Sequence, residues 1–231
     1  MNETDKEEFL AGKTLLIDKP LEWTSFDAVK KIRNTIKIKK VGHAGTLDPL
    51  ATGLLIICTG KHTKKIESYQ GQEKEYTGII SLGKTTPSYD LETAFDSEQP
   101  ASHITIDQVE KSISENFRGE IEQTPPVFSA LKVGGERLYN KARRNEKVEI
   151  KSRLVTVGQF TVERFDSPDI YFRIRCSKGT YIRSLAHDLG QQLGCGAYLK
   201  SLRRTKIGDF SVEDASDIDS FVAKIKSGSA Q

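Results

Sequence analysis

Hydrophobic and polar positions along the chain follow two different periods, and these periods define the first predicted elements. Residues 13–20 and 54–60 are short apolar runs with the length of strands. Residues 24–37 instead repeat apolar side chains at helical spacing, and Thr24 or Ser25 can cap the start of this helix. The inner face of the helix is predicted to carry Phe26, Val29, Ile32 and Ile36.

The rest of the chain continues this mixture of strands and helices without strict alternation. Further strands are predicted at residues 75–83, 155–165, 169–177 and 202–214. Further helices are predicted at residues 63–69, 107–117, 136–144, 179–194 and 217–227, and residues 84–100 form a polar loop. This order predicts the α+β class, with a central mixed or antiparallel sheet flanked by helices and loops.

Composition indicates a globular chain and argues against membrane and secreted classes. Of the 231 residues, 36% are hydrophobic and 29% are charged, as in ordinary folded domains. No apolar run approaches the length of a membrane span, and the acidic N-terminus lacks a signal-peptide pattern. We therefore expect an acidic tail over residues 1–12, a single domain over residues 13–231, and a cytoplasmic location.

Three cysteines form no C-x-x-C pair, so the sequence predicts neither a disulfide framework nor a zinc site. Cys58 and Cys176 lie in apolar runs and are predicted to be buried thiols. The net charge is only +3, but basic residues gather at 30–40, 141–153 and 200–206. Solvated helix faces explain many such runs, yet three of them make a polyanion such as nucleic acid a serious candidate partner.

The stretch VGHAGTLDPLATG, residues 41–53, places one carboxylate and one imidazole among glycines and a proline. Gly42 and Gly45 are predicted to turn the backbone with positive φ, and Pro49 keeps Asp48 out of helical geometry. His43 and Asp48 lack further His or Cys neighbours, so a metal site is not expected. From the loop alone, a structural turn aspartate and a reactive carboxylate remain equally open.

A second segment, CSKGTYIRSLAHDLG over residues 176–190, starts a predicted helix with Tyr181 and Arg183 in its first turn. A cation there is unfavourable with the helix dipole. This placement suggests an anionic partner for Arg183, although an exposed arginine remains an alternative.

At these residues the chain resembles the TruB family of tRNA pseudouridine synthases. Six stretches match in family order, from residue 14 to about residue 212. They are LIDKPLEWTSFDAV, VGHAGTLDPLATG, EKEYTG, TPPVFSALKVGGERLYNKAR, CSKGTYIRSLAHDLG and YLKSLRRTKIGDF. The resemblance implies the pseudouridine synthase fold, with a catalytic cleft and with residues 13–231 as the catalytic domain. It also implies isomerisation of uridine 55 in the tRNA T loop without metal or organic cofactor.

Residue by residue, the resemblance makes Asp48 the catalytic carboxylate and Arg183 its ion-pair partner. Attack on C1′ and deprotonation of the sugar both remain open roles for Asp48. Tyr76 matches the tyrosine that stacks on the target base, and His43 matches a histidine that holds the T loop once the base is extruded. Tyr181 and Leu202 match pocket residues that flank the base. Lys19 and Pro20 match a turn that shapes the pocket floor and are assigned a structural role.

The partner implied by the resemblance is the tRNA T arm, with no membrane and no obligate protein partner, and we expect a monomer. The basic clusters would follow the T-stem phosphates, and residues 124–145 match a mobile element that closes over the T loop. Many family members carry a C-terminal PUA domain, for which this sequence leaves no room, so a T-arm hairpin is expected to bind nearly as well as whole tRNA. The alternatives are a guide-RNA-dependent pseudouridine synthase and a non-catalytic RNA chaperone.

Overall fold

The computed structural model describes residues 3–144, 146 and 148–228. The chain divides into two compact units. Unit 1 consists of the residues up to Tyr76 and those from Leu202 onward, and unit 2 is residues 77–201. Within the described residues, no helix is long and apolar enough to cross a membrane.

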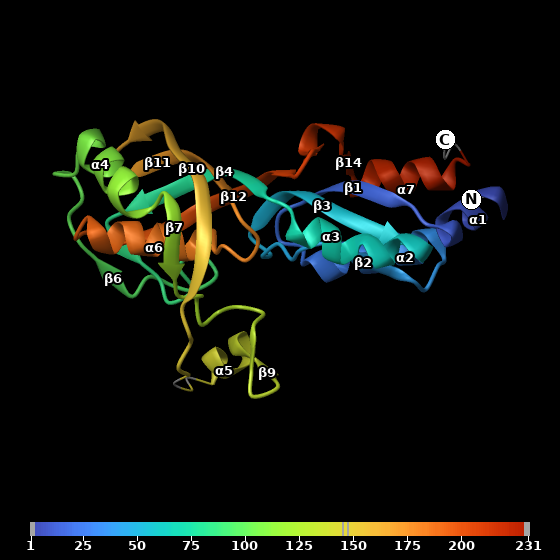
Figure 1. Ribbon diagram of the computed structural model, residues 1–231, viewed down its shortest axis with the longest axis horizontal. Coiled ribbons are helices and arrows are strands. Elements are labelled where there is room, and N and C mark those ends of the chain that lie inside the picture. The colour runs from blue at the N-terminus through green and yellow to red at the C-terminus, as the bar shows by residue number, and fades with distance from the viewer. Residues whose placement is uncertain (1–2, 145, 147, 229–231) are drawn as a thin grey trace. The chain divides into compact units, whose positions relative to one another are not determined.

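Unit 1 is built on a mixed sheet whose strands come from both ends of the chain (Figure 1). Its strands are β1 (Thr14–Lys19), β2 (Val41–His43), β3 (Ala51–Thr59), β12 (Ala197–Ile207), β13 (Phe210–Ser211) and β14 (Ser216–Asp217). The strand β3 pairs antiparallel with β1 and with β2, and parallel with the C-terminal part of β12. At the edges, β1 pairs parallel with β14, and β12 pairs antiparallel with β13. The continuous apolar run predicted for β3 is buried over nearly its whole length, as expected for a central strand.

The helices of unit 1 pack their apolar faces against this sheet and against one another. The helical elements are α1 (Glu3–Ala11), α2 (Ser25–Ile36), η1 (Gly60–Lys65), α3 (Ile66–Gly71), η2 (Val212–Asp214) and α7 (Ile218–Lys226). α1 falls within the segment expected to be an acidic tail, and its Phe9 is buried in the core beside Phe221. α2 begins with the predicted Thr24 cap, which forms a reciprocal capping box with Asp27.

Phe26 was predicted on the inner face of α2, and this prediction is wrong because its side chain is 59% exposed. Val29, Ile32 and Ile36 are buried as predicted. At about 100° per residue, Ser25 lies at the centre of the stripe that these three define, whereas Phe26 lies about 100° away from it. The position of a small polar residue at the centre of the buried face becomes important for the site.

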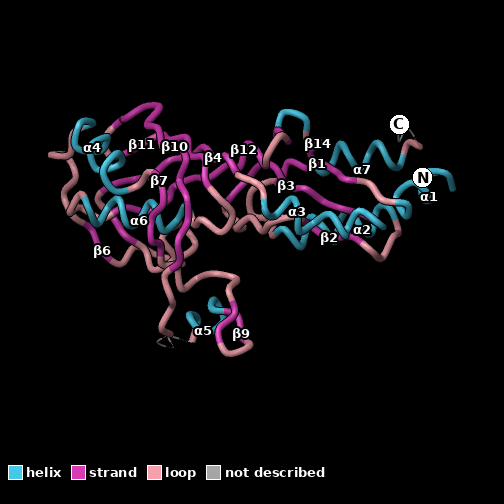
Figure 2. Tube along the Cα trace, in the orientation of Figure 1, coloured by secondary structure: helices cyan, strands magenta, loops and turns pink. Residues whose placement is uncertain are grey.

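Unit 2 is built on a run of paired strands with helices packed on them (Figure 1). Its elements are β4 (Lys74–Leu82), β5 (Lys84–Thr85), β6 (Ser97–Glu98), α4 (Ile106–Asn116), β7 (Gly119–Gln123), β8 (Lys132–Val133), β9 (Glu136–Arg137), α5 (Leu138–Arg143), β10 (Arg153–Asp166), β11 (Asp169–Cys176) and α6 (Ile182–Gln192). The strand order begins with the N-terminal part of β12 and continues with β4, β11, β10 and β7. The helix α4 packs against β10 and α6. The segment between β7 and β10 is mostly loop, with the short β8–β9 hairpin and α5 inside it (Figure 2).

The α+β class and the mixed sheet are thus confirmed, with local differences at element ends. The helix predicted at residues 63–69 is divided into η1 and α3, and the helix predicted to begin at Asp107 begins at Ile106 with Thr105 as its cap. The strands β2 and β7 were not predicted, and residues 84–100, predicted as a polar loop, begin with β5 and contain β6, which pair antiparallel. Cys58 and Cys176 are buried thiols, as predicted.

Candidate active site

The residue before Asp48 is fixed by a buried hydroxyl from α2. Leu47 N–H donates a hydrogen bond to Ser25 Oγ over 2.8 Å, and the same hydroxyl donates to the Leu47 carbonyl over 3.2 Å. Ser25 is 2% exposed and Leu47 is 4% exposed, so water does not compete for these bonds. One hydroxyl at the centre of the inner face of α2 therefore holds both backbone groups of Leu47.

The residue after Asp48 is fixed from the other side. The Pro49 carbonyl accepts a hydrogen bond from Glu22 N–H at 2.9 Å and from Lys19 Nζ at 3.4 Å. The Asp48 carbonyl itself accepts from Ala51 N–H at 3.0 Å, which closes a turn into β3. Anchors on both sides therefore restrict the backbone of Asp48, and its half-buried side chain is presented from a defined point.

Lys19 is a fully buried cation below this loop. Its ammonium group also donates to the carbonyls of Pro20, at 2.9 Å, and Trp23, at 2.6 Å. Burial lowers the pKa of Lys19 to about 8, and the negative charge of Asp48 opposes this shift. Lys19 was assigned only a structural role from the sequence; the structure adds that its charge is attracted by the Asp48 carboxylate.

Arg204 of β12 is the second buried cation of this region, at 1% exposure. Its Nε donates to the Leu54 carbonyl at 2.8 Å, and its Nη2 donates to the Gly45 carbonyl at 3.2 Å. Gly45 has φ +96°, as predicted. Gly42 does not have positive φ, so that prediction is wrong; a Cβ on Gly42 would instead lie 2.9 Å from Ile66 Cδ1.

Unit 1 also brings His43 and Leu202 to this loop. His43 ends β2 just before the loop, and Leu202 pairs with Ala51, which directly follows it. Burial lowers the pKa of His43, a hydrogen bond with the Gly45 backbone opposes this shift, and the positive charge of Arg204 adds to it, so the site favours the neutral imidazole. Among the described residues His43 Nδ1 is buried without a hydrogen-bond partner. Tyr76, also predicted, lies on β4 and is only 9% exposed.

In unit 2, Arg183 lies in the first turn of α6, as predicted, but it is 3% exposed instead of projecting into solvent. Its Nη1 donates to the carbonyls of Ser88, at 3.0 Å, and Phe128, at 2.9 Å. Its Nε lies 3.6 Å from Asp90 Oδ2. Arg183 is thus oriented by the loop after β5 and by the segment after β7, neither of which the sequence connected to it.

Tyr181 occupies the N-cap position of α6, without a capping side-chain hydrogen bond, and its backbone is held by Gln123 from the end of β7. Tyr181 N–H donates to Gln123 Oε1 at 2.8 Å, and Gln123 Nε2 donates back to the Tyr181 carbonyl at 3.1 Å. The Arg153 guanidinium lies 5.0 Å from the centre of the Tyr181 ring. Ser184 Oγ donates to the Thr124 carbonyl at 2.8 Å, so the segment matched to a mobile element is attached to α6 at its root.

The predicted site residues therefore fall into two groups. Asp48, His43, Tyr76 and Leu202 belong to unit 1, and Tyr181 and Arg183 belong to unit 2. The Asp48–Arg183 ion pair stays a prediction. The sequence reasoning missed the supporting residues Ser25, Ser88, Asp90 and Arg204; a buried serine at the centre of an apolar helix face was the one readable signal among them.

The three basic clusters differ in what they offer a polyanion. Five of the six basic residues in 30–40 are exposed lysines. In the cluster at 200–206, Arg203 forms a bidentate ion pair with Asp18, at 2.9 and 2.7 Å, and Arg204 is buried. The positive charges of these two arginines are therefore bound within the protein. In 141–153, Arg144 pairs with Glu136 and Glu146. Lys147 lies outside the described residues.

Comparison with known proteins identifies the family of the chain. Residues 33–182 match the family described as TruB family pseudouridylate synthase, N-terminal domain, and residues 183–228 match the tRNA pseudouridylate synthase B C-terminal domain. A tRNA pseudouridine synthase B of Flavobacterium johnsoniae is 54% identical over 222 residues, covering 93% of this chain and 96% of that protein. One of Phocaeicola vulgatus is 51% identical over 219 residues, covering 92% and 93%.

Solved structures give the same fold. The chain is similar to a subunit of a Cbf5–Nop10–Gar1 complex, with a TM-score of 0.74 and 28% identity, and to one of the archaeal box H/ACA sRNP Nop10–Cbf5 complex, with 0.70 and 26%. Each match covers 96% of this chain, but the chain spans only 58% and 56% of those solved chains.

Proposed function

Because the chain belongs to the TruB family of pseudouridylate synthases, we propose that this isomerase acts on uridine 55 in the T loop of tRNA. The observation that carries the proposal is the Asp48 loop, which Ser25, Glu22 and Lys19 hold at both residues next to the carboxylate. Support for the substrate comes from relatives about half identical over nearly their whole length, which are tRNA pseudouridine synthases B.

The reaction breaks the N1–C1′ glycosidic bond, rotates the uracil and forms a C5–C1′ bond. The C5 hydrogen leaves as a proton and N1 gains one, so no water is consumed and the product has the composition of the substrate. We propose that the ionised Asp48 either attacks C1′, and is later displaced by C5, or removes a proton from the sugar to form a glycal. Either role uses one carboxylate without a second acid, unlike a glycosidase.

We propose that Arg183 pairs with Asp48 in the assembled site and that Tyr76 stacks on the uracil. Leu202 and Tyr181 would flank the base, and His43 would contact the T loop after the base is extruded. His43 is only half-buried and ends β2 directly before the Asp48 loop, which is compatible with an RNA contact by its ring. Lys30 and Lys31 line a groove along α2 together with Glu22 and Asp27, and as exposed lysines they are candidates to contact T-stem phosphates.

The two alternatives are less well supported. The solved guide-type relatives share 26% and 28% identity with this chain, against about half for the tRNA enzymes. We therefore propose a protein that works without guide RNA or an obligate protein partner, as a monomer, in the cytoplasm where mature tRNA is found. A non-catalytic chaperone would have no use for a carboxylate whose neighbours are fixed on both sides.

The test is Asp48→Asn on a T-arm hairpin with tritium at uracil C5. The wild type should release tritium to water and form pseudouridine, and Asp48→Asn should do neither while binding the hairpin within about twofold of the wild type, because charge but not shape is lost. Asp107→Asn, at an exposed carboxylate at the start of α4, is the matched control and should keep full activity. A wild type without tritium release, or an active Asp48→Asn, refutes the proposal.

A further inference from the structure

Two of the groups that orient Arg183 come from one short segment of unit 2, residues 88–90, whose backbone is unusual. The Ser88 carbonyl accepts from Arg183 Nη1 at 3.0 Å, and Asp90 Oδ2 lies 3.6 Å from Arg183 Nε. Tyr89, between these two acceptors, has φ +65°. This left-handed conformation is uncommon for a tyrosine, so contacts elsewhere have to stabilise it.

The Tyr89 side chain is held by a histidine of α6. The rings of Tyr89 and His187 are stacked, with 3.9 Å between their centroids and 14° between their planes. His187 lies four residues after Arg183, about one turn further along the same face of the helix. The helix that carries Arg183 therefore also carries the ring that holds the backbone between two acceptors of Arg183.

The backbone of Tyr89 is anchored on both sides as well. Its N–H donates to the Thr86 carbonyl at 3.1 Å, and its carbonyl accepts from Leu199 N–H of β12 at 2.8 Å. Three anchors therefore act on Tyr89, two through its backbone and one through its ring. Of these three, the ring contact is the one that α6 itself supplies.

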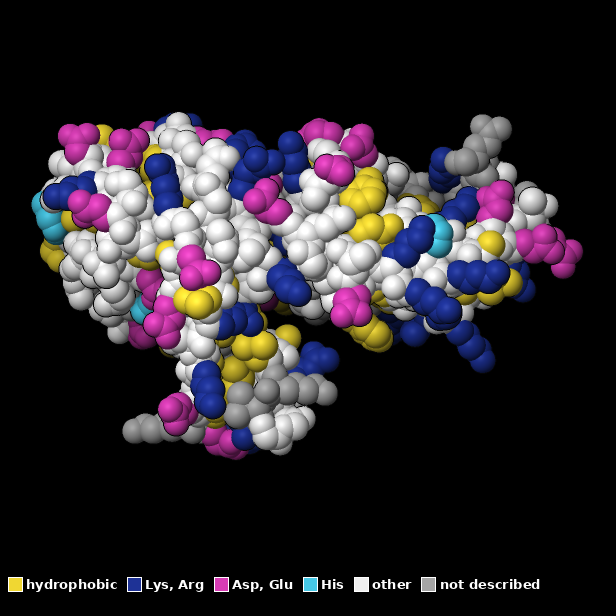
Figure 3. Space-filling view, in the orientation of Figure 1, with side chains coloured by type: hydrophobic (Ala, Val, Ile, Leu, Met, Phe, Trp, Pro, Cys, Tyr) yellow, Lys and Arg dark blue, Asp and Glu magenta, His cyan; other side chains and the backbone are white. Residues whose placement is uncertain are grey.

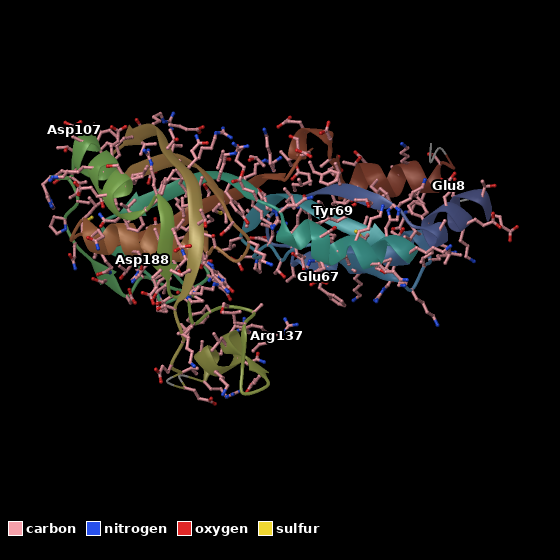
Figure 4. All side chains as sticks on the ribbon, viewed as in Figure 1. Glu8, Glu67, Tyr69, Asp107, Arg137 and Asp188 are labelled. Carbon is pink, nitrogen blue, oxygen red and sulfur yellow. The ribbon has the colours of Figure 1, made fainter. Side chains whose placement is uncertain are left out.

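The charges around this stack are negative, and both rings favour their uncharged form. Burial raises the pKa of Tyr89, and the negative charges of Asp188 and Asp96 add to this shift. Burial lowers the pKa of His187, and Asp96 opposes that shift. Asp188 directly follows His187 on α6 (Figure 4), and acidic side chains lie near α6 and β6 in the space-filling view (Figure 3). Because negative surroundings repel phosphates, the stack is not suited to direct contact with RNA.

We propose that Tyr89 and His187 are positioning residues for the reaction. Their stack holds the Ser88 carbonyl and the Asp90 carboxylate against Arg183 and so keeps the guanidinium aligned. This inference rests on the proposed function for the role of Arg183 in the reaction, whereas the alignment of Arg183 is measurable without RNA. Loss of the stack should slow the chemical step and leave RNA binding nearly unchanged, because a catalytic group displaced by about 1 Å costs up to about 100-fold in rate.

The first measurement follows Arg183 in the full chain without RNA. Hydrogen exchange of its guanidinium, observed by NMR and assigned with Arg183→Lys, should be slow in the wild type because the group is buried and hydrogen-bonded. Tyr89→Leu and His187→Leu should speed this exchange by about tenfold, which corresponds to one lost aromatic pair. Tyr89→Phe and His187→Phe keep a ring at each position and should restore the slow exchange. Phe95→Leu is the matched control, because it removes an aromatic contact with Tyr198 from the same loop.

The second measurement is single-turnover tritium release from the T-arm hairpin at saturating enzyme. Both leucine variants should be slower than the wild type by about tenfold, with hairpin affinity within about twofold, and the phenylalanine variants should recover the rate. In the Arg183→Lys background, Tyr89→Leu should slow the reaction further by less than about twofold, because changes that act through one group are not additive. A purely structural role would lower stability without this dependence on Arg183.

The outcomes separate this inference from the proposed function. If Arg183 exchanges as slowly in Tyr89→Leu as in Phe95→Leu, or if the rate effect of Tyr89→Leu adds fully to that of Arg183→Lys, the inference is wrong. Tyr89→Gly covers the case in which leucine prevents folding, since glycine adopts φ +65° without strain. Slow Arg183 exchange in Tyr89→Gly would show that the ring is not needed and would also refute the inference. If the wild type forms no pseudouridine, the proposed function fails, and the exchange measurement still decides whether the stack aligns Arg183.

Discussion

The hydroxyl of Ser25 offers the sharpest test of how the fold positions Asp48. Replacing Ser25 with Ala removes one donated and one accepted hydrogen bond and leaves the buried backbone groups of Leu47 without partners. Unsatisfied buried groups cost about 1–3 kcal/mol, so we expect the free energy of unfolding to fall by about 2 kcal/mol. Because Leu47 directly precedes Asp48, a shift of about 1 Å there should also slow catalysis by about 10- to 100-fold.

Thr59→Val is the matched control, at the other end of β3. The Thr59 hydroxyl is also fully buried, accepts from Lys13 N–H at 2.9 Å and donates to the Phe9 carbonyl at 2.8 Å. Both variants should lose similar stability in urea unfolding. Only Ser25→Ala should lose rate in single-turnover tritium release at saturating enzyme, and hairpin binding should stay unchanged. Equal rates for the two variants would show that the Ser25 contact does not position the carboxylate.

Two further predictions concern the buried groups around the loop. The pKa of Lys19 is about 8 in the folded chain and near 10.5 when unfolded, so between these values the unfolded chain binds more protons. The free energy of unfolding should therefore rise with pH across this window, by up to about 3 kcal/mol, and Lys19→Met measured by urea unfolding should lack that rise. Gly53→Ala places a Cβ 2.3 Å from the Arg204 carbonyl at φ +102°, and should cost more than about 3 kcal/mol in thermal or urea unfolding. Gly71→Ala has no atom within 4 Å of the new Cβ and should be nearly neutral.

The elements that the sequence predicted well are those whose signals are local. The capping residue and three apolar positions of α2, and the uninterrupted apolar run of β3, depend on a few neighbouring residues each. The prediction that Phe26 is buried was wrong because three apolar residues at helical spacing define a buried face of α2 but not the residue at its centre. The residue at the centre is the small polar Ser25. β2 and β7 escaped prediction because they are only 3 and 5 residues long and depend on pairing with distant strands.

The candidate residues of the Asp48 loop could be predicted from the sequence, but the residues that support them could not. Asp48 and His43 stood out because a rigid, glycine-rich stretch carried few reactive groups, but their supports come from elsewhere in the chain. Ser25 contacts a residue 22 positions away, and Arg204 reaches Gly45 across 159 positions. Apart from the small polar Ser25 on the apolar face of α2, no local pattern indicates such contacts, so the sequence could single out Asp48 as the candidate catalytic residue but not the groups that hold its backbone in place.

These supports also explain why Arg203 and Arg204, adjacent in one basic cluster, have different uses. Successive residues of a strand point to opposite faces, so Arg203 reaches Asp18 with a partly exposed ion pair while Arg204 enters the interior. Burying a guanidinium costs several kcal/mol unless its donors find partners, and the Leu54 and Gly45 carbonyls accept from two of its five N–H groups. The backbone carbonyl of Gly45 is thereby fixed three residues before Asp48, on the side opposite to the anchors at Pro49. When a basic cluster lies on a strand, the residues of its two faces therefore have to be considered separately before their charges are taken as evidence of RNA binding.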